Sequence, residues 1–143
     1  MAADEAALAA LLQGQGKLDE AEAVYRRVLT LFERAYGPEH YEVAVNLNNL
    51  AAVHHVRGEA ASAEPLYRRA LAVKEKLLGP GHVDVALTLS NLAALCWDLG
   101  RKVEAESLYR RALAIYEPAL EPGHPKVVAC REDYAALQAI EHG

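Results

Sequence analysis

The sequence predicts an all-α fold, an α-solenoid in which about seven helices stack as antiparallel pairs. Three observations predict it. The chain repeats itself every 42 residues. Its 143 residues are rich in Ala and Leu and poor in Thr, Ile and Phe, a composition that favours helices over strands. Within each repeat, apolar residues recur at the three- and four-residue spacing of an amphipathic helix.

The repeat is visible at thirteen of the 42 positions, which are identical in all three copies. Tyr25-Arg26-Arg27 of the first copy returns as Tyr67-Arg68-Arg69 and as Tyr109-Arg110-Arg111. Residues 1–15 form a partial copy, and full copies occupy 16–57, 58–99 and 100–141. Helix pairs of this kind bury their apolar faces only by stacking on their neighbours. We therefore expect residues 1–143 to form a single solenoid domain.

Each copy contains two helical runs, and the partial copy contains one. In the first copy, Leu18, Val28 and Leu29 belong to the apolar face of the first run, and Val43 and Leu47 to that of the second. The same reading of the whole chain predicts helices over residues 3–14, 18–36, 41–57, 60–78, 83–99, 102–120 and 125–141.

Glycine and proline mark the breaks between runs. Gly37 can adopt the left-handed cap conformation, and Pro38 cannot continue a helix. In the third copy Glu121 replaces this glycine, so a different exit from the preceding helix is expected. Pro65 lies inside the run over 60–78, where it predicts a lost backbone hydrogen bond or a later helix start.

Small and aromatic residues at repeated positions explain how the pairs would stack. Alanines recur at the positions of Ala21 and Ala51, where they let helix backbones approach closely. The repeated Tyr25, Tyr67 and Tyr109 would fill the larger spaces between the helix pairs.

Three sequence strings carry a resemblance to a known family. They are Ala-Glu-x-Leu-Tyr-Arg-Arg-Ala-Leu at 63–71, Gly-Pro-x-His-x-x-Val-Ala at 79–86 and Leu-Asn-Asn-Leu-Ala at 47–51. With the glycine between helices and alanine at fixed offsets, they resemble the tetratricopeptide repeat (TPR). The 42-residue period is similar to the longer subclass found in kinesin light chains. The resemblance covers nearly the whole chain.

The resemblance implies a right-handed superhelix whose concave groove binds a peptide segment of a partner protein. Transferred by position, the groove residues are Asn48, Asn49, Ala52 and His55 in one helix, Ser90, Asn91, Ala94, Trp97 and Asp98 in the next, and Glu132, Asp133 and Ala136 in the last. Asn49 and Asn91 share one repeat position, and an amide there can bond a peptide backbone of any sequence. Asp133 takes this position in the last copy and Ala7 in the partial copy, so the asparagine series has two members.

Two of these features have an alternative reading. Asn is disfavoured inside helices because its side chain competes for backbone hydrogen bonds, which favours a groove role for Asn48, Asn49 and Asn91 over local capping. Trp97 is either an anchor for a partner or part of the core, and both readings stay open.

The repeated charged residues and histidines are better explained by a structural role in the helices than by binding of a partner or a metal. Glu22 and Arg26, and their equivalents in the other copies, form helix-stabilising pairs four residues apart. The second arginine of each pair lacks such a glutamate and is the better candidate for contact with a partner. His40, His82 and His124 recur once per 42-residue repeat. Their helices would lie ~10 Å apart, too far for a shared metal with bonds of ~2.0–2.1 Å.

Composition and motifs exclude several classes of function. A net charge of −5 gives no basic surface for nucleic acid, and no apolar run is long enough to span a membrane. No nucleophile, phosphate-loop or metalloprotease motif is present, and we predict no enzyme activity, no metal and no cofactor. Cys96 and Cys130 are expected to be small buried residues without a disulfide, consistent with the cytoplasm.

The predicted function is therefore a non-catalytic interaction module that holds a peptide of another protein in its groove. Groove positions with Asn, Ser, Ala and acidic residues disfavour the carboxylate clamp, which needs Lys and Arg. The alternative is a self-assembling scaffold, or a fragment of a longer array, that forms homo-oligomers through the N-terminal helix. That helix is Ala-rich and lacks the polar outer face of a terminal repeat.

Overall fold

The computed structural model describes residues 2–142, and within them every regular element is an α-helix. The helices are α1 (Ala2–Gly14), α2 (Leu18–Tyr36), α3 (Tyr41–Val56), α4 (Ala60–Leu78), α5 (Val83–Asp98), α6 (Lys102–Ala119) and α7 (Pro125–His142). All seven predicted helices are confirmed, each boundary to within one residue. Residues 1 and 143 lie outside the described part, as do the side chains of the first six residues and the last three.

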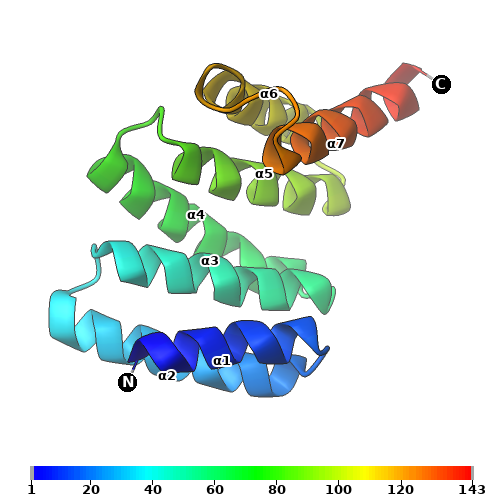
Figure 1. The fold of residues 1–143 in the computed structure, drawn as a ribbon. Coiled ribbons are helices and arrows are strands. Elements are labelled where there is room, and N and C mark those ends of the chain that lie inside the picture. Colours follow the sequence, from blue (N-terminus) through cyan, green and yellow to red (C-terminus); the bar gives the residue numbers. More distant parts are fainter. Residues whose placement is uncertain (1, 143) are drawn as a thin grey trace. The chain divides into compact units, whose positions relative to one another are not determined.

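The chain forms two compact units, residues 2–77 and 78–142. In the first unit, α1 packs on α2 and α2 on α3 (Figure 1). Their core contains Ala9, Ala21, Val24, Tyr25, Val28, Leu50 and Val53. The Tyr25 hydroxyl donates a hydrogen bond to Gln13 Oε1 at 3.1 Å, which ties α2 to α1. Val43 and Leu47 of α3 pack on Ala70 of α4.

The second unit contains α5, α6 and α7, with α6 packed on both of the others (Figure 1). Its buried residues include Leu89, Leu92, Ala105, Tyr109, Ala112, Tyr116, Val127, Cys130 and Leu137. Ala105 and Tyr109, which stand at positions identical in all three copies, are both buried. The single domain over residues 1–143 stays a prediction, which this division does not test.

The repeated histidines directly precede the helices that follow the three proline-containing breaks. In His40, His82 and His124, ring Nδ1 accepts a hydrogen bond from the backbone N–H two residues later, at 3.1 Å each. The first N–H groups of a helix have no partner within it, so each ring satisfies one of them as an N-cap. The structural role predicted for these histidines is therefore that of an N-cap, in which the ring accepts a backbone hydrogen bond.

The break at Gly37 differs from the predicted left-handed cap. Gly37 has φ 85° and ψ 171°, an extended backbone conformation with positive φ rather than a left-handed helical one. The residue before a proline is excluded from helical ψ values, and Pro38 follows directly. Only glycine adopts this region readily. At the third break, where Glu121 replaces glycine, the cap residue Leu120 is extended with φ −125°, so the exit does differ. Helix α4 continues through Pro65 without a later start.

Candidate partner-binding groove

Helix α5 has two faces of opposite character. Val85, Leu89 and Leu92 are fully buried, which fixes the orientation of the helix. Ser90, Asn91, Ala94 and Trp97 lie on the other face and are partly exposed, and Asp98 is exposed. The spacing of three and four residues therefore places five predicted groove residues on one side of α5.

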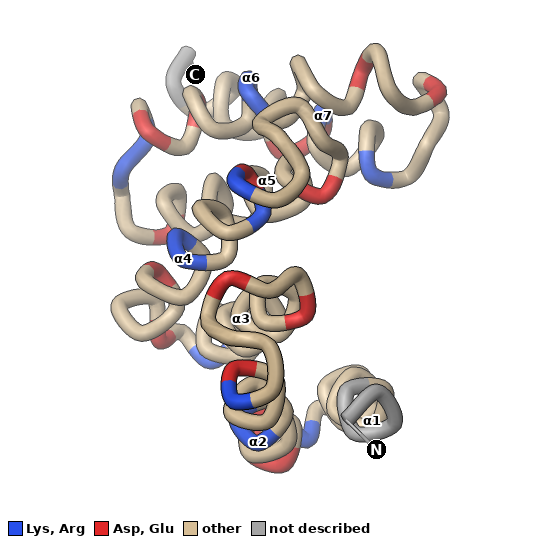
Figure 2. Tube along the Cα trace, turned by 90° about the vertical axis from the view of Figure 1, so that its left-hand side faces the viewer, with Lys and Arg blue, Asp and Glu red and all other residues tan. Residues whose placement is uncertain are grey.

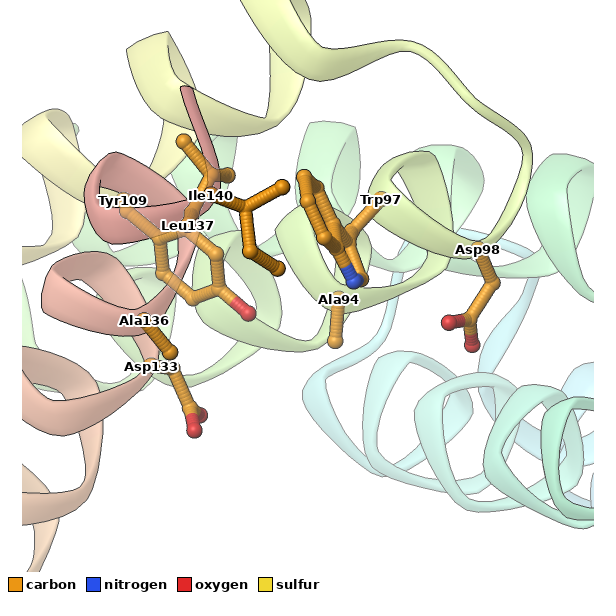
Figure 3. A pocket seen from close by; sticks show the side chains of 8 residues that line it. All are labelled: Ala94, Trp97, Asp98, Tyr109, Asp133, Ala136, Leu137 and Ile140. Carbon is orange, nitrogen blue, oxygen red and sulfur yellow. The ribbon is translucent and has the colours of Figure 1, made fainter. Parts of the chain in front are cut away.

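A cavity of about 220 Å³ opens beside this face, between α5, α6 and α7 (Figure 3). It is lined by Ala94, Trp97, Asp98, Tyr109, Asp133, Ala136, Leu137 and Ile140. The Trp97 ring, Ala94 and the aliphatic side chains form apolar walls. The carboxylates of Asp98 and Asp133 lie at different sides of the cavity (Figure 3).

A second cavity of about 200 Å³ lies further towards the N-terminal part of α5. It is lined by Leu87, Ser90, Asn91, Ala94, Tyr116, Lys126, Ala129, Cys130 and Asp133. Ala94 and Asp133 line both cavities, so the two adjoin. We call the surface formed by the two linings the α5–α7 groove.

The electrostatic environment of the groove is set by its carboxylates. Partial desolvation, with the neighbouring charge of Glu132, raises the pKa of Asp133. Burial is the main cause of a raised pKa for Tyr109, and the charges of Asp133 and Asp98 add to it. Both carboxylates therefore act on the same phenol, which keeps its proton. Helix α5 has only two charged residues, Asp84 and Asp98, and both are acidic. Figure 2 shows how acidic and basic residues are distributed along the chain as a whole.

One basic side chain lies close to the aromatic wall. Lys102 Nζ is 5.7 Å from the centroid of the Trp97 ring, a cation–π distance. Lys126 lines the second cavity and not the first. Arg131, on α7, is paired instead with Glu117 at 2.6 Å.

Seven of the predicted groove residues line the two cavities: Ser90, Asn91, Ala94, Trp97, Asp98, Asp133 and Ala136. Glu132 is exposed and lines neither. The lining also contains residues that the sequence pattern assigned to the core or left unassigned, notably Tyr109 and Ile140. Tyr109 is 4% exposed and contributes to both the core and the cavity wall. Its repetition with Tyr25 and Tyr67 indicates packing only, so the sequence could not distinguish it.

The other predicted groove residues lie on α3, in the first unit. Asn49, Ala52 and His55 are partly exposed, while Asn48 is 7% exposed and thus mostly buried. The His55 ring meets Tyr67 edge-on, with centroids 6.5 Å apart. This contact fixes the orientation of the ring.

A third asparagine of α3, Asn46, is buried with one of its polar atoms unsatisfied, which the sequence did not predict. Asn46 is 1% exposed, and its Nδ2 donates to the carbonyl of Glu42 at 2.8 Å. Its buried Oδ1 has no hydrogen-bond partner among the described residues. Buried amides normally bond fully, so this oxygen is a cost to the fold.

The three Glu–Arg pairs form as predicted. The distances are 3.5 Å for Glu22–Arg26, 2.8 Å for Glu64–Arg68 and 4.0 Å for Glu106–Arg110. The second arginines are less available than expected. Arg69 pairs across helices with Glu33 at 3.5 Å, because the neighbouring helix supplies the carboxylate that its own helix lacks.

Among the side chains that the structure describes, those of residues 7–140, no cluster of three or more His, Cys, Asp or Glu could hold a metal ion. Within residues 2–142 no helix combines the length and the apolar character needed to cross a membrane. Cys96 and Cys130 are both buried and form no disulfide, and the Cys96 thiol donates a hydrogen bond to Glu104 Oε1 at 3.4 Å.

Comparisons with known proteins agree with the fold. The chain resembles a crystal structure of nearly identical TPR-like repeats of a putative kinesin light chain from Podosopora anserina, with 23% identity and a TM-score of 0.85 over 94% of this chain and 64% of that one. BtubC (BKLC) from P. vanneervenii is 24% identical, with a TM-score of 0.78 over 99% of this chain and 65% of that one. The chain thus spans less than two thirds of the length of these structures.

A shorter structure is also similar. The first TPR of Spaghetti (RPAP3), bound to the HSP90 peptide SRMEEVD, is 20% identical, with a TM-score of 0.71 over 99% of this chain and 94% of that one. The comparison with curated proteins found no match. The family model described as tetratricopeptide repeat matches residues 2–76, 42–118 and 84–142, which together cover nearly all of the sequence. The chain therefore belongs to the tetratricopeptide repeat family, as its repeated strings indicated.

Proposed function

We propose that the protein is a non-catalytic interaction module that binds a peptide segment of a partner protein along the α5–α7 groove. The observation that carries this proposal is the pair of adjoining cavities, which seven of the groove residues expected from the family resemblance line. A concave, mostly apolar surface with a few polar groups is typical of a binding site. Such a surface on a rigid helical scaffold also loses little conformational entropy on binding.

Each part of the groove has a role in this proposal. Asn91 supplies an amide that can hydrogen-bond the backbone of an extended or a helical peptide. Ala94 keeps the floor low enough for the peptide to approach the helix. Trp97 supplies a large apolar contact of the kind that dominates interface energies. The TPR of RPAP3 holds a peptide of another protein, which supports peptide binding as the general function.

The asparagine positions provide the test. Asn91→Ala alone, and the double variant with Asn49→Ala on α3, should weaken partner binding while leaving helicity and the melting temperature nearly unchanged. Ala has the higher helix propensity, so loss of folding is not expected. An affinity pull-down with the 143-residue chain and the double variant, followed by a titration, measures the effect. Equal binding by both chains would contradict the groove assignment.

A second candidate function is self-assembly, which two exposed leucines favour. Leu8 and Leu11 of α1 are 45% and 57% exposed. Neighbouring apolar side chains left open on a terminal helix can pair with another copy. Light scattering over a concentration series should then show mass increasing with concentration, and Leu8→Glu with Leu11→Glu should abolish the increase. A constant monomer mass would remove this candidate.

The cytoplasmic location of the protein stays a prediction.

A further inference from the structure

Two exposed leucines of α1 occupy repeat positions that are buried in the next copy. Leu8 lies 42 residues before Leu50, and Leu11 lies 42 residues before Val53. Leu50 and Val53 of α3 are 0% exposed, whereas Leu8 and Leu11 are 45% and 57% exposed. The same positions of the repeat are therefore covered on α3 and open on α1.

The contact of α1 with α2 leaves these leucines outside. Ala9 and Leu12 are the residues of α1 that pack in the core of the first unit. Each follows one of the exposed leucines directly, and successive residues of an α-helix point about 100° apart. Leu8 and Leu11 are three residues apart and share a side of the helix. They form a second apolar stripe on α1, which we call the α1 face.

Helix α2 is the element that covers the equivalent stripe of α3 (Figure 1). Leu50 and Val53 belong to one buried cluster with Tyr25 and Val28 of α2. Tyr25 and Val28 are also three positions apart, so they lie on one side of their helix. The covered stripe of α3 therefore meets an aromatic and an aliphatic residue of an amphipathic helix.

Charged residues show the direction in which α2 crosses α3. Arg57, directly after α3, pairs with Glu22 at 2.7 Å and also with Asp19, and both acids lie near the N-terminal end of α2. The two helices are therefore antiparallel. Gln15 stands 42 residues before Arg57, and the exposed Lys17 follows it. A helix that covered α1 in the same way would bring its first turn towards Lys17, where acidic side chains are favourable.

The repeat also indicates which molecule supplies such a helix. Within one copy, the equivalent stripes of α2, α4 and α6 contain Tyr25, Tyr67 and Tyr109, which are 1%, 2% and 4% exposed. A second copy of the folded chain keeps these stripes buried in its own core. A helix of another protein has no such constraint, so it fits the α1 face better than a second copy does.

We propose that the α1 face binds an amphipathic helix of a partner protein. The bound helix runs antiparallel to α1 and places an aromatic and an aliphatic residue, three positions apart, on Leu8 and Leu11. Acidic residues of its first turn lie towards Lys17. Leu8 and Leu11 line neither cavity, so this surface is separate from the α5–α7 groove and the inference goes beyond the proposed function.

Helix α2 itself supplies the probe, because it has each feature that the proposal requires. A fluorescent synthetic peptide of residues 18–36, blocked at both ends, is titrated with the 143-residue chain, and fluorescence anisotropy measures Kd. Binding should be saturable. Leu8→Glu with Leu11→Glu should raise Kd at least about tenfold, because charge replaces the apolar surface that the peptide covers. Leu31→Glu is the matched control, since Leu31 is 45% exposed on α2, and it should leave Kd unchanged.

Reversal of charge tests the direction of the bound helix. Lys17→Glu should raise the Kd of the peptide about two- to fivefold, as expected for an ion pair at the surface. A peptide with Asp19→Lys and Glu22→Lys should instead bind the Lys17→Glu chain more tightly than the wild-type chain. Unfolding of a variant cannot produce this reversal. An equal response of the two peptides to Lys17→Glu would overturn the antiparallel placement.

The other outcomes separate this inference from the article's other proposals. Equal binding to the wild-type chain and to the double leucine variant would mean that the peptide displaces α2 or binds elsewhere, and would overturn the inference. Absence of binding would overturn it as well. If light scattering then showed association that the double leucine variant abolishes, the occupant of the α1 face would be a second copy. Peptide binding in the α5–α7 groove is tested separately by Asn91→Ala.

Discussion

Arg57 Nη1 lies 2.7 Å from Glu22 Oε1, and this ion pair joins the turn after α3 to helix α2. Arg26 approaches the other carboxylate oxygen of Glu22 at 3.5 Å and also donates to His54 Nε2 at 3.2 Å. Arginine can only donate, so His54 accepts at Nε2 and donates from Nδ1 to Glu59 at 3.2 Å. Residues 35 positions apart in the sequence thus form one network.

This network predicts how stability depends on pH. Partial burial alone would raise the pKa of Glu22, but the hydrogen bond from Arg57 and the charges of Arg26 and Arg57 lower it overall. A carboxyl with a lowered pKa in the folded state stabilises the fold above its unfolded pKa, and this contribution is lost as the pH falls through the folded value. Glu22→Gln should therefore lower stability at pH 7 by about 1 kcal/mol and have little effect at pH 2–3. Urea unfolding at both pH values measures it.

The control for this prediction is Glu39→Gln, which removes the pair that Glu39 makes with Lys76 on the surface of the same unit. Exposed pairs contribute little, so this change should be nearly neutral. An equal effect of Glu22→Gln at both pH values would show that packing, and not charge, is responsible.

The histidine N-caps predict a defined cost when they are removed. His82→Ala deletes the acceptor for the N–H of Asp84 and should lower the free energy of unfolding by about 1 kcal/mol, as other N-cap deletions do. His82→Asp restores an acceptor at a favoured N-cap residue and should recover most of the loss. Urea denaturation of the three chains gives the values. A loss with His82→Asp as large as with His82→Ala would rule out capping as the role of the ring.

The Cys130 thiol should be unreactive in the folded chain. Burial, with the charges of Asp133 and Glu117, raises its pKa to about 11. Only the thiolate reacts, and its fraction grows about tenfold with each pH unit below the pKa. Alkylation by iodoacetamide should therefore be much slower than in the urea-unfolded chain at pH 8, and should accelerate as the pH rises towards 10. Mass spectrometry of the labelled peptide follows it. Equal rates in the folded and unfolded chains would contradict a buried thiol.

Asp133, which lines both cavities of the groove, should lower the free energy of unfolding at neutral pH. Its raised pKa means that the folded state binds the proton more tightly than the unfolded state does. Stability from this residue is therefore present below the usual pKa of Asp and is lost as the pH rises through the raised value. Asp133→Asn should leave the melting temperature at pH 7 unchanged or higher, even if it weakens ligand binding. Differential scanning calorimetry measures this, with Glu121→Gln as control. A clear drop in melting temperature would mean that the ionised carboxylate stabilises the fold.

The sequence by itself determined the helices and their order. Helical spacing, the repeated glycines and the prolines that follow them are local signals, and each acts within a few residues of the chain. The 42-residue repeat then specified that successive helix pairs would pack in the same way, and the alanines and tyrosines at fixed positions supplied the means. This is why every boundary was predicted to within one residue, and why the family could be inferred from the repeated strings.

Only the tertiary structure decided what the side chains meet across helices. The backbone conformation of Gly37 depends on its direct neighbour in the sequence, Pro38. The ion pair of Arg69, in contrast, depends on Glu33, which lies on another helix. The double role of Tyr109 and the burial of Asn48 likewise depend on the packing of neighbouring helices. Distance, burial and electrostatic environment arise between elements that are remote in sequence. A linear pattern can therefore place a residue on a helix face, but it cannot give the space and the charge in front of that face.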